Sequence, residues 1–331
     1  MTATTKGEAN RPTVFMFSGQ GSQYFQMGQE LYSKNQRFKL WMDLCDDIVA
    51  PLINTSLIAV LYESGNKNTA FDRVLYTTPA LISVQYSLAQ LLLEKSIRPD
   101  YLLGYSLGEF TAAILGGAME LEQGLRLSVA FSRCIENKVP EARMLAILDS
   151  VDVMQRHPEV FRDCVLTGEN FNNNFVVSAS PQRMMQLQTW LKQNGKQSEL
   201  LDIKYGFHTP DMQLVEDDIK QLMKTVPMFS LQVPMLSSVT GEEIADTADE
   251  YLWNVLRQPV QFKMAVENLL KHGDPICIDL SPSGVLAALV KYIKPVDSDA
   301  LLIECMNKFG RDVATLDKAL SQLAQPVSHK P

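Results

Sequence analysis

The sequence lacks a long apolar run and an excess of positive charge. Nowhere do about 18 apolar residues follow one another, as a membrane-spanning helix requires, and residues 1–10 lack the apolar core of a secretory signal. A formal net charge of −8 leaves no global basic field to attract nucleic acid or an anionic membrane. These absences predict a cytoplasmic protein that binds neither nucleic acid nor a membrane.

Cysteine and histidine are both scarce. The five cysteines are widely spaced, with no CxxC pair and no histidines at metal-ligand spacing. We therefore expect reduced thiols, no bound metal and no other cofactor. The four histidines make the search for a catalytic base short.

Short apolar runs alternate with helical patterns over most of the 331 residues. Four runs have the pattern of buried strands, and four longer segments have the periodicity of helices. This alternation predicts the α/β class, with a parallel sheet covered on both faces. The strands are predicted at 13–17, 101–103, 234–239 and 276–280, and the helices at 79–95, 122–137, 260–271 and 284–293.

The middle of the chain has a different order of elements. Between residues 142 and 204 the pattern is strand, helix, strand, strand, helix, strand, which is typical of a small ferredoxin-like subdomain. We predict that this subdomain is inserted into a large α/β-hydrolase-like domain made of residues 12–141 and 205–323. Residues 1–11 and 324–331 are expected to be tails.

A serine stands between two glycines in GYSLG, residues 104–108. A strand-like run precedes this segment and a helical pattern follows it, which is the context of a nucleophile exposed on a tight turn. The alternative is that Ser106 only caps a helix between two structural glycines.

A nucleophilic serine needs a base, and His208 is the best placed candidate. It lies in YGFHTPDM, where the chain returns from the predicted insert to the large domain. The alternative is a structural histidine. Acyl transfer also needs an oxyanion hole, for which Leu107, directly after the serine, offers one N–H and the glycine-rich segment FSGQGSQ offers a second.

These motifs resemble a known family. FSGQGSQ, GYSLGE and FHTP, in this order and at these spacings, are similar to the motifs of malonyl-CoA:acyl-carrier-protein transacylases and polyketide synthase acyltransferases. The resemblance covers residues 12–323. FMFSGQGSQYFQMG and YTTPALISVQYSLA are especially similar to the stand-alone acyltransferases that act in trans on modular polyketide synthases.

The resemblance implies a role for several positions. Ser106 corresponds to the nucleophile and His208 to the general base of a Ser-His dyad, and the N–H groups of Gln20 and Leu107 correspond to the oxyanion hole. In this family a main-chain carbonyl orients the histidine, and the matching carbonyl is predicted near Val255. The implied partner is an acyl carrier protein that bears phosphopantetheine, with acyl-CoA as a further thioester substrate.

The chain departs from the malonyl-transferring members at one important position. Those members carry an arginine about 25 residues after the nucleophile, whose planar guanidinium binds the malonyl carboxylate. The corresponding residue is Phe131. Arg133 and Arg126 lie on the same predicted helix, but they are rotated from this position by roughly 200° and 140°. We predict an apolar acyl pocket formed by Phe131 with Phe207 and Tyr105, the last at a position where the family commonly has histidine.

An apolar pocket favours uncharged acyl groups. In this respect the sequence resembles the acyl hydrolase branch of the trans-acting enzymes. The first hypothesis is therefore a proofreading hydrolase that removes acyl groups from carrier-protein thioesters. The alternatives within the family are an acyltransferase for acetyl groups and a malonyl transferase with an unrecognised carboxylate clamp. Outside these, a carrier-binding module without activity and a small-molecule esterase remain as hypotheses.

Overall fold

The computed structural model describes residues 11–247 and 250–324. The predicted tails, apart from residues 11 and 324, lie outside these ranges. Within them no single helix is long and apolar enough to cross a membrane, although one pair, Gln36–Ile53 and Leu57–Glu63, passes this test jointly despite a bend of 100°.

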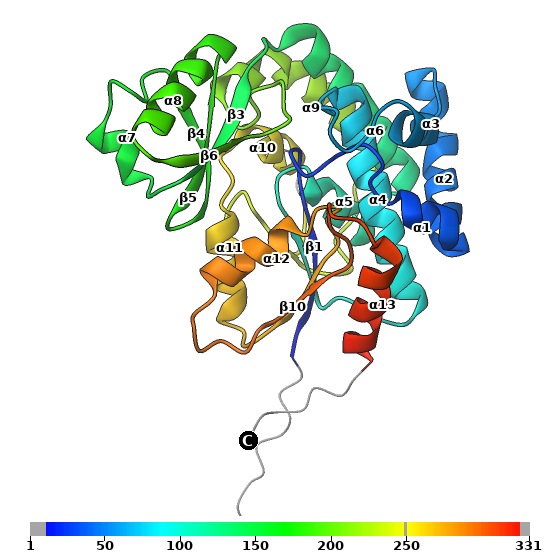
Figure 1. Cartoon of the computed structure of the whole chain (residues 1–331). Helices are drawn as coiled ribbons and strands as arrows, with labels where there is room; N and C mark the ends of the chain where they lie inside the picture. The colour runs from blue at the N-terminus through cyan, green and yellow to red at the C-terminus, as the bar shows by residue number, and fades with distance from the viewer. Residues whose placement is uncertain (1–10, 248–249, 325–331) are drawn as a thin grey trace, which may run out of the picture.

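A six-stranded sheet forms the centre of the molecule (Figure 1). The strand order is β10-β9-β1-β2-β7-β8, and all neighbours are parallel except β7 and β8. The first strand of the chain is therefore an inner strand, held between β2 and β9. The strands are β1 (Thr13–Phe17), β2 (Tyr101–Gly104), β7 (Met235–Leu236), β8 (Glu243–Ile244), β9 (Ile276–Asp279) and β10 (Leu301–Glu304).

Alternate residues of β1 enter different hydrophobic cores, because successive strand side chains point to opposite faces of a sheet. Phe15 and Phe17 belong to the larger core, whereas Val14 and Met16 belong to a smaller one. Both faces of the sheet are thus covered, as the apolar strand pattern predicts.

Helices supply the other side of each core. The larger core includes residues of α2 (Gln36–Ile53), α4 (Val74–Glu94), α5 (Gly108–Leu115), α6 (Leu121–Lys138) and α13 (Asp312–Leu323), and the smaller one includes α11 (Phe262–Leu270) and α12 (Val285–Ile293). The other helices outside residues 142–204 are α1 (Gln29–Lys34), α3 (Leu57–Glu63), α9 (Glu216–Lys224) and α10 (Tyr251–Arg257), together with the 3-10 helix Pro210–Val215.

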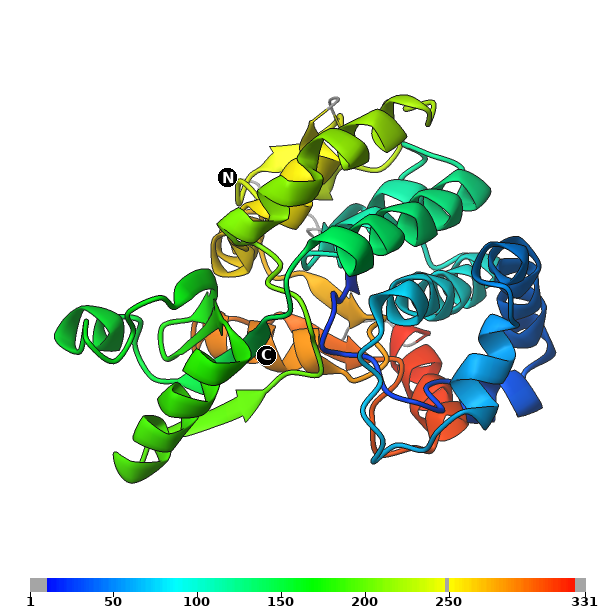
Figure 2. The same cartoon turned by 90° about the horizontal axis from the view of Figure 1, so that it is seen from above.

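A second, four-stranded antiparallel sheet stands beside the first, with the order β4-β5-β3-β6 (Figures 1 and 2). Its elements follow the predicted strand-helix-strand-strand-helix-strand order. They are β3 (Arg143–Leu148), α7 (Asp152–Arg156), β4 (Val165–Phe171), β5 (Asn174–Ala179), α8 (Pro181–Gln193) and β6 (Gln197–Leu200). The two ends of this segment meet, because the Ala142 N–H donates to the Lys204 carbonyl at 2.8 Å. This closure is the geometry of an insertion.

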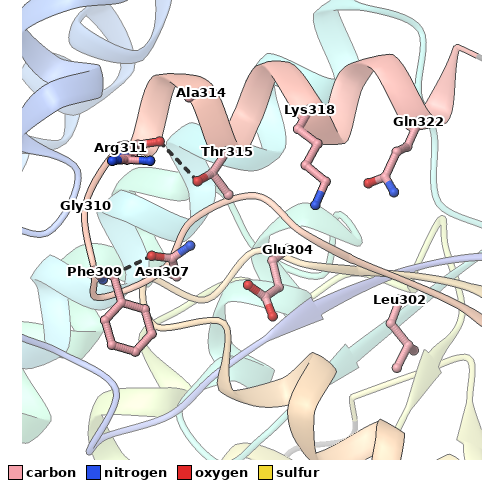
Figure 3. Close-up of a pocket in the computed structure, with 10 residues that line it drawn as sticks. All are labelled: Leu302, Glu304, Asn307, Phe309, Gly310, Arg311, Ala314, Thr315, Lys318 and Gln322. Carbon is pink, nitrogen blue, oxygen red and sulfur yellow. Dashed lines mark hydrogen bonds between the residues drawn. The ribbon is translucent and has the colours of Figure 1, made fainter.

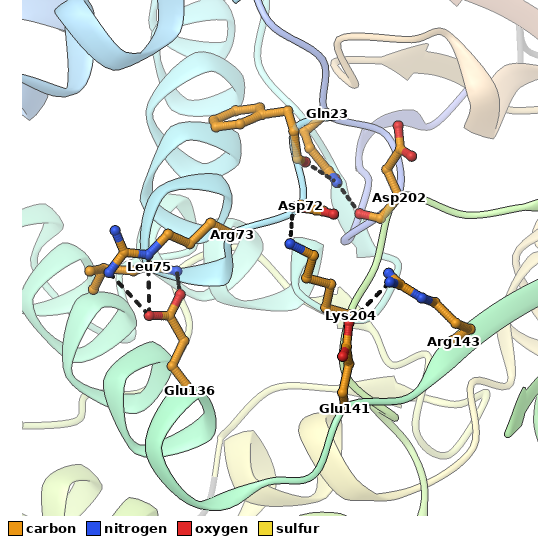
Figure 4. A network of polar contacts seen from close by, with 10 residues as sticks. Gln23, Asp72, Arg73, Leu75, Glu136, Glu141, Arg143, Asp202 and Lys204 are labelled. Atoms are coloured by element: carbon orange, nitrogen blue, oxygen red, sulfur yellow. Dashed lines mark hydrogen bonds and ion pairs between the residues drawn. The ribbon is translucent and has the colours of Figure 1, made fainter. Parts of the chain in front are cut away.

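The returning end of the segment is attached to the large sheet through polar contacts (Figure 4). Gln23 Nε2 donates to the carbonyl oxygens of Phe71 and Asp202, at 2.9 and 2.8 Å. Lys204 Nζ lies 2.9 Å from the Asp72 carboxylate. Gln23 is buried, so its two hydrogen bonds fix the position of the connection more firmly than the exposed ion pair does.

Strand β4 forms a second attachment. The Val260 N–H donates to the Thr167 carbonyl at 2.8 Å, and Lys263 Nζ lies 3.0 Å from Glu169. At the end of the strand, the Phe171 ring stacks on Tyr292 of α12. The small sheet is thus held against the large one on both sides of the space between them.

Candidate active site

The turn after β2 holds Ser106 in a left-handed conformation, with a φ of 53°. Helix α5 begins shortly afterwards at Gly108, which packs against the main chain of β1. A Cβ atom at Gly108 would overlap the carbonyl oxygen of Phe17, so only glycine permits this approach. The resulting strand-turn-helix presents the Ser106 hydroxyl at the carboxyl edge of the parallel strands.

His208 faces this hydroxyl from the loop after β6. Its Nε2 lies 2.7 Å from Ser106 Oγ, and its Nδ1 lies 2.7 Å from the main-chain carbonyl oxygen of Gln258. Because a carbonyl oxygen only accepts hydrogen bonds, Nδ1 carries the proton and Nε2 presents its lone pair to the serine. The imidazole is therefore oriented to accept a proton from Ser106.

Burial keeps this imidazole neutral. His208 is 4% exposed, and desolvation lowers its pKa to about 4, although the hydrogen bond to the Gln258 carbonyl acts in the opposite direction. The neutral form therefore predominates near neutral pH, as a general base requires.

The prediction that the carbonyl near Val255 orients the histidine is wrong. Val255 lies inside α10, whereas the carbonyl that contacts His208 belongs to Gln258, just beyond the helix end at Arg257. Gln258 precedes Pro259, and a residue before proline is disfavoured in the helical region. Its extended backbone, with φ −82° and ψ 150°, turns the carbonyl out of the helix and toward the imidazole.

The two N–H groups predicted for an oxyanion hole come from neighbouring turns. A Cβ atom on Gly19 would lie 2.6 Å from the Tyr105 carbonyl oxygen, so the glycine-rich loop before Gln20 contacts the turn that carries Ser106. In the described residues, the N–H groups of Gln20 and Leu107 donate to no protein acceptor. Two uncommitted donors beside a nucleophile are what a developing oxyanion requires.

A small chamber surrounds the serine and the histidine. We name this cavity of about 30 Å³ the reaction chamber; it adjoins an outer cavity of about 220 Å³. Tyr105 and Gln20 line both spaces, and Phe207 lines the chamber. The rest of the chamber wall is mostly apolar and consists of Met144, Thr167, Val176, Leu201, Ile203 and Val260.

This geometry agrees with what comparison with known proteins shows. A family model described as the acyl transferase domain matches residues 14–327. The chain belongs to the acyl transferase domain family.

Two bacterial members of this family are similar over nearly their whole length. The polyketide biosynthesis acyltransferase homolog PksD of Bacillus subtilis strain 168 is 34% identical over 309 residues, which are 93% of this chain and 95% of that protein. The polyketide biosynthesis acyltransferase homolog BaeD of Bacillus velezensis is 32% identical over 318 residues, which are 96% of this chain and 98% of that protein.

Solved acyltransferase structures share the fold. A loading acyltransferase from the avermectin modular polyketide synthase superposes with a TM-score of 0.86 at 23% identity, covering 95% of this chain and 100% of its own. The malonyl CoA-acyl carrier protein transacylase of Clostridium perfringens gives 0.78 at 21% identity, covering 94% and 97%. The predicted α/β class with a parallel sheet core is confirmed.

In this acyl transferase domain Phe131 lies elsewhere than predicted. It is 1% exposed and packs against Phe110 of α5, with ring centroids 5.1 Å apart, and it lines neither the reaction chamber nor the outer cavity. Phe131 is part of the hydrophobic core, because its apolar ring, which comes from α6, is stabilised by burial against α5. Phe131 therefore does not contribute to the chamber wall.

In this acyl transferase domain a buried acid, Glu109, stabilises the turn that carries Ser106. Glu109 Oε1 accepts hydrogen bonds from Ser238 N at 2.5 Å and from Ser238 Oγ at 2.6 Å, and Oε2 accepts one from the Tyr251 hydroxyl. Ser238 Oγ in turn accepts the Ser106 N–H at 3.3 Å. Burial raises the pKa of Glu109 to about 7. The sequence placed Glu109 only within a motif, and nothing in the spacing of Ser238 marked it as a partner of the turn.

The other described histidines and a larger groove lie apart from this site. His157 contacts Trp190 and His272 contacts Tyr101, while His329 lies outside the described residues. A groove of about 680 Å³ between β10 and α13 is lined by residues such as Glu304, Arg311 and Lys318, and by neither Ser106 nor His208 (Figure 3). In the described ranges, no three histidine, cysteine or acidic side chains are grouped to hold a metal ion.

Proposed function

We propose that this chain hydrolyses short, uncharged acyl groups from the phosphopantetheine thioesters of acyl carrier proteins in polyketide biosynthesis. In this role it is a trans-acting, cytoplasmic, proofreading enzyme. The observation that carries the proposal is the wall around Ser106. Among the described residues, no lysine or arginine lines the reaction chamber or the outer cavity, and the one acidic lining residue, Glu199, repels a malonyl carboxylate.

The chamber also favours a small acyl group. A volume of about 30 Å³ accommodates roughly two water-sized groups. This space suits an acetyl group, whereas a longer chain has to extend into the outer cavity or displace the surrounding side chains. Apolar surface around the acyl chain is stabilising, but it offers no partner for a carboxylate, whose desolvation costs several kcal/mol.

The first half-reaction follows from the serine-histidine geometry. Ser106 Oγ attacks the thioester carbonyl carbon while His208 Nε2 takes the hydroxyl proton. The N–H groups of Gln20 and Leu107 stabilise the negative charge on the carbonyl oxygen. The C–S bond then breaks, the phosphopantetheine sulfur receives the proton from His208, and the acyl group remains on Ser106 as an ester.

The second half-reaction uses the same base. A water molecule gives its proton to His208 and attacks the acyl ester, and collapse of the tetrahedral intermediate returns the proton to Ser106 Oγ. A carboxylic acid leaves. The carbonyl oxygen of Gln258 stabilises the imidazolium in both halves, because it accepts the hydrogen bond from Nδ1 and its partial negative charge faces the ring.

Transfer is the second candidate, and the names of PksD and BaeD as acyltransferase homologs favour it. The two reactions share the acyl-Ser106 intermediate and differ in whether water or a second thiol attacks it. Acetyl and malonyl donors, and carrier protein as acceptor, therefore have to be compared directly.

Intact mass spectrometry distinguishes these reactions. The protein is mixed with acetyl-loaded carrier protein in one tube, and with malonyl-CoA and unloaded carrier protein in another, and Ser106→Ala is run in parallel. Loss of the acetyl mass from the carrier, which the alanine variant does not produce, supports hydrolysis. Rapid malonylation of Ser106 followed by malonyl-carrier formation contradicts the proposal and identifies a malonyl transferase.

A further inference from the structure

Gln20 contributes its main chain to the oxyanion hole, yet its side chain is also held firmly. Gln20 Oε1 accepts a hydrogen bond from the Thr77 hydroxyl, and Gln20 Nε2 donates one to the Thr78 hydroxyl oxygen, both at 2.9 Å. Thr77 and Thr78 are buried at the start of α4. The two hydroxyls thus bind both ends of the same amide.

The loop that carries Gln20 has little conformational preference of its own. Gln20 lies between two glycines, and Gly21 adopts a φ of +102°, where other residues are strained. A Gly-Gln-Gly segment samples many main-chain orientations unless other groups restrict it. The direction of the Gln20 N–H therefore depends on the anchors around it.

Helix α4 supplies a further anchor before Gln20. Besides the two threonines, Gln85 Oε1 accepts the Ser18 N–H at 2.6 Å, and Gln85 Nε2 donates to the Ser18 carbonyl at 3.1 Å. Thr78 and Gln85 are seven residues apart and lie on the same face of the helix. One rigid helix thus determines the path of the loop before and at Gln20.

We propose that Thr77 and Thr78 are positioning residues for the oxyanion hole. Their hydroxyls hold the side-chain amide of Gln20, and this fixes the direction of the Gln20 main-chain N–H toward the thioester oxygen in the transition state. This inference rests on the proposed function, because it assumes that an acyl group is transferred to Ser106. Neither threonine lines the reaction chamber or the outer cavity. Their loss should therefore slow acylation without weakening substrate binding.

The test compares valine and serine at the same positions. Valine keeps the size and branching of threonine but removes the hydroxyl, whereas serine keeps the hydroxyl. Acylation of Ser106 by acetyl-pantetheine is followed by rapid quench and intact mass. We expect Thr78→Val and Thr77→Val each to lower kcat about tenfold or more with KM nearly unchanged, below the 10²–10³-fold loss on removing an oxyanion donor. Thr78→Ser should retain most of the activity.

A second measurement separates positioning from general damage to the fold. A trifluoromethyl ketone analogue of the thioester forms a tetrahedral adduct, and its affinity should fall by the same factor as kcat in the valine variants, while thermal unfolding stays close to that of the parent. Equal kcat in the valine variants and the parent overturns the inference, as does a Thr78→Ser variant that is as slow as Thr78→Val. If the parent itself never acylates Ser106, the proposed function fails instead.

Discussion

At the scale of single residues, the contact between His208 and Gln258 is made by the main chain. The Gln258 side chain is exposed, so its identity should matter little. We expect Gln258→Ala to keep kcat/KM within about threefold of the parent, whereas His208→Ala should lose about 10³-fold or more because the base is removed. Steady-state hydrolysis of an acetyl thioester measures both. A Gln258→Ala variant as inactive as His208→Ala would show that the side chain is required.

The low pKa of His208 predicts an unusual acid limit. Protonation removes the base, so activity falls as pH drops through the pKa of about 4, not through the ordinary value of 6.5. We expect kcat/KM to be nearly flat down to about pH 5, to be halved near pH 4, and to approach a tenfold fall for each pH unit only below about pH 3. Half-loss of kcat/KM near pH 6.5 would contradict this.

The same residue affects stability. The unfolded chain binds a proton to His208 below pH 6.5, whereas the folded chain binds it only below about pH 4. The contribution of His208 to stability is therefore complete above pH 6.5 and is lost as pH falls toward 4.

Sequence reasoning succeeded at single residues where a motif fixes local chemistry, and failed where side-chain direction decides. Ser106 and His208 were chosen by their motifs, and the structure brings them together. Counting residues along α6 identified Phe131, but it could not show that the ring turns into the core toward Phe110. The orienting carbonyl was predicted near Val255 and belongs to Gln258, because the point at which α10 ends depends on Pro259 and the tertiary contacts around it.

At the scale of elements, the turn between β2 and α5 depends on the absence of a side chain at Gly108. We expect Gly108→Ala to lower the free energy of unfolding by about 3 kcal/mol or more, because the new Cβ meets main-chain atoms of β1 that cannot move aside. Chemical denaturation measures this free energy.

Gly195→Ala is the matched control. Its φ is +66°, but a Cβ there contacts nothing, so the cost should be only about 1–2 kcal/mol of backbone strain. Equal losses in the two variants would mean that contact with β1 is not what requires glycine at Gly108.

The pattern of apolar residues in the sequence located some strands and helices correctly and missed others. The buried strands β1, β2 and β9 were located because each is a continuous apolar run. The predicted strand at 234–239 shrinks to the two residues of β7, since Ser238 bonds to Glu109 and to Gln261, the residue before α11, instead of to a neighbouring strand. Helices α1 to α3 were not predicted. The signal was present in α2, because its buried residues recur every three or four positions, at Phe38, Met42, Cys45, Val49 and Ile53.

At the scale of the whole molecule, two contacts tie the returning connection to the large sheet, and they should differ greatly in weight. Gln23→Ala removes two donated hydrogen bonds and the acceptor for the Gly21 N–H in a buried place. We expect a loss of about 2–3 kcal/mol in unfolding free energy. We also expect slower hydrolysis, because Gln23 binds both Gly21, next to Gln20, and Asp202, which follows the small sheet.

Lys204→Met provides the comparison on the same connection. The lysine side chain is 40% exposed, so its ion pair with Asp72 should contribute less than about 1 kcal/mol. Urea unfolding of both variants decides the order. A Lys204→Met variant less stable than Gln23→Ala would reverse the assignment of the principal attachment.

The place of β1 between β2 and β9 also determines when the protein can fold during its synthesis. β1 ends at Phe17, but its partner β9 begins only at Ile276. At about 5–20 residues per second, a ribosome makes the first strand roughly 13–50 seconds before that partner. Throughout this interval one edge of β1 lacks a neighbour, and open strand edges pair with other chains. Nascent chains that stall before β9 should therefore aggregate more readily than completed chains.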